Sequence, residues 1–257
     1  IYLIEDAAQS PLATENNIFS GTIGHIGVFS LNYHKHIHTG EGGMCCTNDD
    51  ELALRLRSIR NHGENICDPL QIKDITNLIG FNFRMTEISA AIGLEQLKKL
   101  DFLVKERESI AINLSNSLKG INSLTPPVTR KESRHVYYIW GAKFNRETCH
   151  IKTSTIIKAL NCEGLPMVKG YIKPLYLLPV FQRKVAIGNK GWPFNQSNQS
   201  YPKGTCPVAE SLFEKTLLTF NICCFSLNKY ERKEVINIFD KVFTNLKSLA
   251  ESNLNNL

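Results

Sequence analysis

Three short apolar runs near the start of the chain constrain its fold more than any other feature. They occupy residues 1–4, 26–31 and 43–47, and polar or glycine-bearing segments separate them. Short continuous apolar runs are typical of strands in a parallel sheet that is buried on both faces. A helical pattern up to about residue 60, capped by Asp49 or Asp50, follows the third run. The sequence therefore predicts an α/β architecture for this part of the chain.

The pattern changes after a long helical stretch that begins beyond Met85 and ends near Gly120. Further elements follow in mixed order: an aromatic-rich strand at 136–144, a helix at 153–160, a strand at 220–225 and a final helix with a capping box at Asn228 and Glu231. The apolar face of that helix is spaced four, three, four and three residues apart, at Val235, Phe239, Val242, Leu246 and Leu249.

Two domains are expected from this change of pattern. Residues 1–105 form the α/β part, and residues 106–257 form a smaller α+β domain. Residues 182–207 are rich in Gly, Pro, Asn, Gln and Ser and lack periodicity, which predicts a long loop.

Charge and hydropathy argue against two classes of protein. The chain has 30 Lys and Arg against 24 Asp and Glu, a net charge of +6, but its basic residues are scattered rather than clustered, so we expect no nucleic-acid partner. The longest apolar stretches, 174–181 and 216–227, are too short or too interrupted to cross a membrane.

Eight cysteines are present, and no pair has C-x-x-C spacing. They stand at positions 45, 46, 67, 149, 162, 206, 223 and 224. This spacing does not predict a zinc site or a disulfide framework, and we interpret them as buried free thiols in a reducing compartment, which indicates a cytoplasmic protein.

Two segments carry candidate chemistry. Asp6 ends the first apolar run, at the edge of a parallel sheet where ligands bind, although an acid in this position is equally typical of a helix N-cap. Lys35 lies among small and polar residues, where a lone lysine is more often solvated surface. His34, His36 and His38 alternate around it, but no carboxylate or thiolate with ligand spacing joins them, so no metal site is predicted.

Taken together, the two segments are far more specific than either alone. The chain has Glu5-Asp-Ala-Ala-Gln9, Phe29-Ser30, Lys35, Gly40-Glu-Gly-Gly43 and Thr47-Asn-Asp49, in this order. Further motifs follow at 60–63, 80–86, 90–93, 96–97, 174–176 and 206–210. This series resembles the DegT/DnrJ/EryC1/StrS family of sugar aminotransferases, and the resemblance covers nearly the whole chain.

The resemblance implies a type I pyridoxal 5′-phosphate (PLP) transferase fold, with a partial parallel-sheet large domain and a smaller C-terminal α+β domain. It implies that Lys35 holds the PLP aldehyde covalently and acts as the catalytic base. Asp6 would pair with the pyridine nitrogen, Gln9 would contact the ring hydroxyl, and Ser30 would bind the phosphate. Asn82 resembles the residue that reaches the phosphate of a neighbouring subunit, which implies a homodimer with a shared active site.

The implied reaction is transfer of an amino group from glutamate to a keto-sugar nucleotide. Some relatives carry histidine in place of the lysine and catalyse a sugar 3-dehydration, but counting from Phe29 and back from Glu41 places Lys35 in the lysine position. The family also carries a substantial portion before the first motif, which is missing here. A truncated, non-catalytic homologue therefore remains an alternative, and we expect this chain alone to be unstable or to bind PLP poorly.

Overall fold

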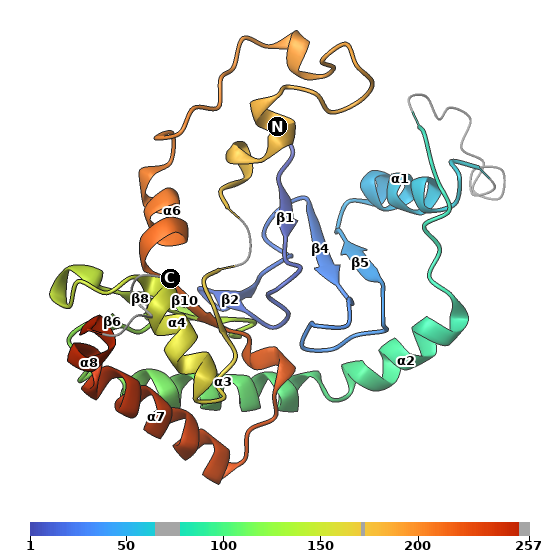
Figure 1. The fold of residues 1–257 in the computed structure, drawn as a ribbon. Coiled ribbons are helices and arrows are strands. Elements are labelled where there is room, and N and C mark those ends of the chain that lie inside the picture. The colour runs from blue at the N-terminus through green and yellow to red at the C-terminus, as the bar shows by residue number, and fades with distance from the viewer. Residues whose placement is uncertain (65–77, 171–172, 252–257) are drawn as a thin grey trace. The chain divides into compact units, whose positions relative to one another are not determined.

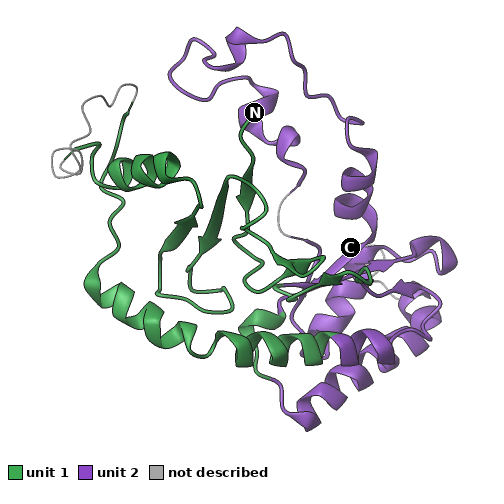
Figure 2. Cartoon of the chain, turned by 180° about the vertical axis from the view of Figure 1, so that it is seen from behind, with its two compact units in different colours: residues 1–111, 129–138, 222–226 green, residues 112–128, 139–221, 227–257 purple. Residues whose placement is uncertain are grey.

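The computed structural model describes residues 1–64, 78–170 and 173–251. The chain divides into two compact units, shown in separate colours in Figure 2. Unit 1 contains residues 1–111, 129–138 and 222–226, and unit 2 contains residues 112–128, 139–221 and 227–257. Segments from three parts of the chain thus make up each unit. The predicted domain boundary after residue 105 stays a prediction.

The main sheet of unit 1 has three strands in the order β1 (Ile4–Asp6), β4 (Ile26–Ser30) and β5 (Gly43–Cys46), visible in blue in Figure 1. Strands β1 and β4 are parallel, as predicted, but β4 and β5 are antiparallel, so the expectation of a parallel third strand is wrong. The reason is the connection: residues 31–42 form no crossover helix, and without a crossover a chain returns antiparallel.

A second small sheet joins distant parts of the sequence within unit 1. Its order is β3 (Ile18–Phe19), β2 (Thr14–Glu15) and β7 (Ser133–Arg134). Glu15 holds it together, because its carboxylate accepts hydrogen bonds from Arg130 at 2.7 Å and from the Ser133 hydroxyl at 2.5 Å. This pairing brings residues 129–138 against the beginning of the chain.

Among its described residues, unit 1 holds all or part of three helices: α1 (Asp50–Arg60), α2 (Glu87–Leu97) and α3 (Leu100–Ser117). The predicted cap of α1 is confirmed, because Asp49 accepts a hydrogen bond from the Leu52 amide at 3.0 Å. The single long helix expected after Met85 is instead two helices, α2 and α3. They are separated at Lys98 and Lys99, where the Lys99 amide bonds back to Gln96 in a tight turn.

The buried core of unit 1 surrounds the connection between β4 and β5. It consists of Leu31, Ile37, Leu100, Val104 and Val136, with Leu12, Ala13, Met85 and Leu103 packed against it. Leu31 and Ile37 both lie in the β4–β5 connection, so this loop is anchored in the core on either side of Lys35.

Unit 2 contains an antiparallel sheet whose strand order differs from the order along the chain, with helices beside it. The sheet order is β6 (Leu124–Thr125), β8 (Trp140–Phe144), β10 (Leu217–Phe220) and β9 (Met167–Val168). Its helices are α4 (Thr153–Cys162), α5 (Pro179–Gln182), α6 (Pro207–Ser211), α7 (Lys229–Thr244) and α8 (Leu246–Glu251). Single turns lie at Arg146–Thr148, Leu175–Leu177, Phe194–Gln196 and Leu212–Thr216, and in unit 1 at Ile222–Cys224.

Several expectations for this half of the chain are confirmed and others are wrong. The capping box of Asn228 and Glu231 is present, and α7 buries Val235, Phe239 and Val242 as predicted. The long loop predicted over 182–207 is confirmed: between the end of α5 and the start of α6 the chain forms one short 3-10 helical turn, at Phe194–Gln196, and an isolated bridge between Ile187 and Trp192. The strand expected at 220–225 lies instead at 217–220.

The cysteines differ from expectation in one respect. The seven in the described part of the chain are free, but Cys45, Cys162, Cys206 and Cys224 are exposed rather than buried. Cys67 lies outside the described residues. Across those same described ranges, no helix combines the length and the apolarity needed to cross a bilayer.

Candidate active site

The first motif builds a turn against the end of β1. The Glu5 carboxylate accepts three backbone hydrogen bonds, from the amides of Gly21 at 2.7 Å, Ile23 at 2.6 Å and Gly24 at 2.5 Å. Burial alone would raise the pKa of Glu5, but these three donors hold it below its usual value. Glu5 is therefore a structural anchor, a role that the sequence reasoning did not assign.

Asp6 follows at the carboxyl end of β1, where the sequence places it. Its side chain is exposed, and it accepts one hydrogen bond from the Ala8 amide at 3.2 Å. This local bond orients the carboxylate at the edge of the sheet and leaves further lone pairs for a ligand.

Lys35 lies in the loop between β4 and β5, and backbone hydrogen bonds close this loop at its base. Leu31 accepts a bond from Thr39 at 3.0 Å and donates one to Gly42 at 2.9 Å, while the Lys35 amide itself bonds to Asn32 at 3.0 Å. A closed loop with two residues in the core holds the lysine backbone in one place.

The environment of the Lys35 amine favours its neutral form. Burial lowers the pKa of Lys35, while the negative charge of Asp6 acts in the opposite direction. The amine nitrogen Nζ lies 4.5 Å from the centroid of the Tyr138 ring. A partly buried amine with a lowered pKa and a nearby carboxylate is the arrangement that a carbonyl-binding lysine requires.

A cavity of about 520 Å³ opens beside this amine within unit 1. Lys35 and Ser30 both line it, with Ala7 from the first motif, and most of its other lining is apolar. The structure thus brings Lys35, Ser30 and the end of β1 to one place. An amine and a hydroxyl line this cavity, and the Asp6 carboxylate is close enough to act on the charge of that amine. These three groups fit a PLP molecule, which offers an aldehyde, a phosphate and a pyridine nitrogen.

Two other side chains near Lys35, His36 and Cys223, are both uncharged at neutral pH. His36 is buried, and its Nε2 is 2.8 Å from the carbonyl oxygen of Val136. Burial lowers the pKa of His36, as expected of a ring that stays neutral. The Cys223 thiol also faces Lys35, but burial raises its pKa to about 12, so it stays protonated at neutral pH.

Three of the predicted ligands, Asp6, Gln9 and Asn82, are not among the residues that line this cavity. Gln9 is exposed on the turn that follows Asp6, and it is not among the residues that line the cavity. Asn82 is exposed in an extended segment, paired with Asn61 and flanked by the exposed rings of Phe81 and Phe83. Its side chain accepts a bond from the Arg84 amide at 3.4 Å.

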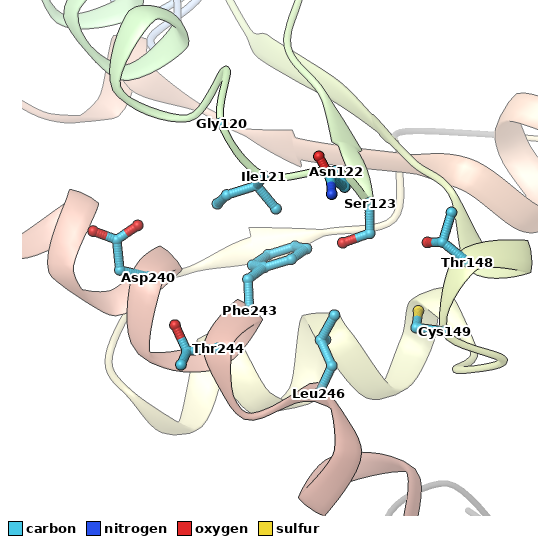
Figure 3. A pocket seen from close by; sticks show the side chains of 10 residues that line it. All are labelled: Gly120, Ile121, Asn122, Ser123, Thr148, Cys149, Asp240, Phe243, Thr244 and Leu246. Atoms are coloured by element: carbon cyan, nitrogen blue, oxygen red, sulfur yellow. The ribbon is translucent and has the colours of Figure 1, made fainter.

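Another cavity of about 520 Å³ lies in unit 2, and Figure 3 shows it from close by. The Phe243 ring occupies its middle, with Asp240 to one side and Cys149 to the other. No amine or imidazole lines it, and it brings no acid and base together. Neither does any group of three or more His, Cys, Asp or Glu in the described ranges gather as metal ligands.

Comparison with solved structures identifies the fold. An X-ray structure of an aminotransferase from Psychrobacter cryohalolentis superposes with a TM-score of 0.79 and 27% sequence identity, covering 96% of this chain and 63% of that one. The chain therefore has the type I PLP-transferase fold of the sugar aminotransferases. It belongs to the DegT/DnrJ/EryC1/StrS aminotransferase family, whose profile matches residues 1–219.

The chain is similar to curated relatives whose names refer to GDP-linked sugars. GDP-perosamine synthase from Caulobacter vibrioides is 34% identical over 182 residues, which are 70% of this chain and 47% of that protein. GDP-4-keto-6-deoxy-D-mannose 3-dehydratase from Yersinia pseudotuberculosis is 31% identical over 204 residues, 72% of this chain and 51% of that protein. The chain thus spans about half the length of these relatives. Members of the family use PLP.

Proposed function

We propose that the full-length protein carrying this chain transfers an amino group from glutamate to a keto-sugar nucleotide, with PLP as its cofactor. The observation that carries the proposal is the Lys35 amine: it is partly buried, its pKa is lowered, and it lies within reach of the Asp6 charge. Family membership and the sugar-nucleotide relatives support the substrate class.

The residues of this chain would divide the work between them. PLP supplies an electron sink that stabilises negative charge at the substrate carbon. Lys35, in its neutral form, would hold the cofactor by its aldehyde and would move the proton at that carbon. Asp6 would keep a proton on the pyridine nitrogen, Ser30 would donate to the phosphate, and Gln9 would contact the ring hydroxyl.

A sugar dehydratase is the second candidate, because one of the relatives is named as such. That reaction is expected when histidine replaces the lysine, and two observations argue against it here. Lys35 lines the cavity, whereas His36 does not. His36 is instead 5% exposed, with Nε2 bonded to Val136. It therefore has no route to act as the base in place of Lys35.

The test is a substrate panel given to the full-length protein. With PLP, glutamate and 3-keto or 4-keto sugar nucleotides, we expect an amino sugar nucleotide detected by mass. We expect Lys35→Ala to reduce the turnover rate about 10³-fold or more, since it removes both the nucleophile and the base.

Two outcomes would contradict the proposal. A dehydrated, nitrogen-free sugar would show that the dehydratase assignment is correct. Wild-type turnover in the Lys35→Ala variant would show that this amine is not the reacting group. As a control, Lys233→Ala changes a solvent-facing lysine of α7 and should leave turnover unchanged.

A further inference from the structure

Residues 135–138 lie against the Lys35 loop although they follow it by about a hundred positions. The Tyr138 ring faces the Lys35 amine, with 4.5 Å between Nζ and the ring centroid. The neighbouring residue Val136 accepts the hydrogen bond from His36, and the His36 and Tyr138 rings are 6.2 Å apart. Lys35 and His36, which are consecutive in the β4–β5 loop, thus both contact residues 135–138.

The position of this segment is fixed from both sides. Strand β7 immediately precedes it and pairs with β2, while the Val136 side chain is buried in the core beside Leu31 and Ile37. The Tyr137 hydroxyl is 3.1 Å from the Thr129 hydroxyl. A segment held by a sheet, a core side chain and a hydrogen bond presents the Tyr138 ring in one orientation.

We propose that Tyr138 is a positioning residue for Lys35, and that its ring holds the amine beside the cavity whenever the amine is not bonded to the cofactor. The proposal rests on the proposed function, since it concerns the same lysine. An aromatic face attracts a cation, so the ring favours the ammonium form of Lys35. Burial favours the neutral amine, and the two effects oppose each other at one nitrogen.

Three other groups act on this amine or stand beside it. Asp6, at the end of β1, favours the ammonium form of Lys35 through its negative charge. The Cys223 side chain would have the same effect if its thiol were ionised. Cys223 remains a thiol near neutral pH, since its pKa is about 12. His36 is the next residue in the chain and stays neutral. The Tyr138 ring and Asp6 are therefore the two groups that favour the ammonium at working pH.

Substitutions of Tyr138 distinguish the effect of its aromatic face from the effect of its size. Tyr138→Phe keeps the aromatic face, whereas Tyr138→Leu keeps apolar cover but removes that face. We expect the pKa of Lys35 to fall by about half a unit in Tyr138→Leu and to stay unchanged in Tyr138→Phe. Tyr138→Met is a second non-aromatic variant in case the leucine protein does not fold.

The measurement uses the full-length protein freed of PLP. Cyanate reacts with neutral amines, and peptide mass gives the rate of carbamylation at Lys35 as a function of pH. Below the pKa we expect this rate to rise about threefold in Tyr138→Leu and to match the wild type in Tyr138→Phe. Tyr230→Leu is the control, because that ring is 82% exposed at the start of α7. Circular dichroism verifies that each variant is folded.

The carbamylation rates of Lys35 test the role of Tyr138 without any measurement of catalysis. Equal Lys35 rates in wild type, Tyr138→Leu and Tyr138→Met would overturn the proposal, and so would a rise in Tyr138→Phe as large as that in Tyr138→Leu. Absence of transaminase activity would contradict the proposed function but leave this readout intact. Where turnover is measurable, we expect the acidic limb of its kcat–pH profile to move in the same direction by the same half unit.

Discussion

At the scale of single residues, Glu5 connects the first motif to the glycine-bearing loop that follows it. Its carboxylate accepts three backbone amides and holds residues 21–24 against the end of β1. Asp6, the adjacent acid, is left exposed at the sheet edge. Two neighbouring carboxylates therefore have different roles, one structural and one available to a ligand.

This geometry predicts acid sensitivity that depends on Glu5. The pKa of Glu5 is below its usual value in the folded protein, so the stability it contributes is present above about pH 4.3, the usual value, and is lost as the pH falls through the folded-state pKa. We expect Glu5→Gln to lower the free energy of unfolding by about 2 kcal/mol at pH 7, because an amide offers one acceptor oxygen and no charge.

Denaturant titrations of the full-length protein from pH 7 to pH 3 measure this effect. The difference between wild type and Glu5→Gln should shrink as the pH falls. Glu234→Gln is a suitable control, because that carboxylate is exposed on α7 and accepts a hydrogen bond from the Asn237 side chain on the same helix. A constant difference at every pH would show that the Glu5 charge is not the cause.

The position of Lys35 beside the cavity agrees with the prediction from sequence, whereas the contacts that its neighbours make with it could not be predicted. A motif with fixed spacing identifies the lysine because residues 29–43 form one closed loop. Nothing in that motif reveals that Tyr138 and Val136 lie against it, since only the folded chain joins segments a hundred residues apart. The aromatic run at 136–144 reads as one strand, but β8 begins only at Trp140, and Tyr137 has a positive φ of 49°.

At the scale of elements, the close contact between β4 and the loop of Gly21 constrains how the main sheet of unit 1 is built. A Cβ atom at Gly27 would lie 1.9 Å from the carbonyl oxygen of Gly21. Gly21 itself has a φ of +83° and packs under the Phe29 ring. No side chain fits between these two backbones, so the spacing of the glycines follows from the sheet.

Gly27→Ala should therefore be strongly destabilising. Either β4 or the Gly21 loop must move, and we expect a loss of about 3 kcal/mol or more, at the upper end of overpacking effects. Gly120→Ala is the matched control, because nothing lies within 4 Å of an added Cβ there. Thermal unfolding of both full-length variants measures the contrast; equal midpoints would contradict the close approach.

Local signals predicted helix ends better than strand directions. The caps at Asp49 and Asn228 depend on residues within one turn, and both are present. The direction of β5 depends on whether a crossover helix intervenes, which an apolar run does not reveal. The strand at 217–220 ends where the single turn at 222–224 begins, although Cys223 and Cys224 continue the apolar pattern.

At the scale of the whole molecule, large apolar surfaces are exposed in unit 1. Ile1, Tyr2, Leu3 and Ile4 are all more than half exposed along the open edge of the main sheet. Ile88, Leu94 and Leu97 of α2 are likewise exposed. Surfaces of this kind usually mark interfaces. Because the chain spans about half the length of its relatives, we propose that the rest of the full-length protein and a second subunit cover them.

The segment around Asn82 offers a direct test of the proposed homodimer. Asn82 stands between Phe81 and Phe83, which are 56% and 64% exposed, and it does not line the cavity beside Lys35. An exposed polar residue within an apolar strip is suited to a subunit interface. If Asn82 serves the active site of the partner, Lys35→Ala on one chain and Asn82→Ala on the other fall in the same active site and leave the second site of the dimer intact.

Mixing the two full-length variants should then restore activity. Random exchange makes half of the dimers mixed, and each mixed dimer has one intact site, so we expect about a quarter of wild-type turnover. Lys35→Ala mixed with Asp6→Ala is the matched control. Both of these residues belong to the same site on the same chain, so neither site of a mixed dimer is intact. If the Asn82 mixture recovers no more turnover than this control, Asn82 does not act across subunits, and the shared active site is wrong.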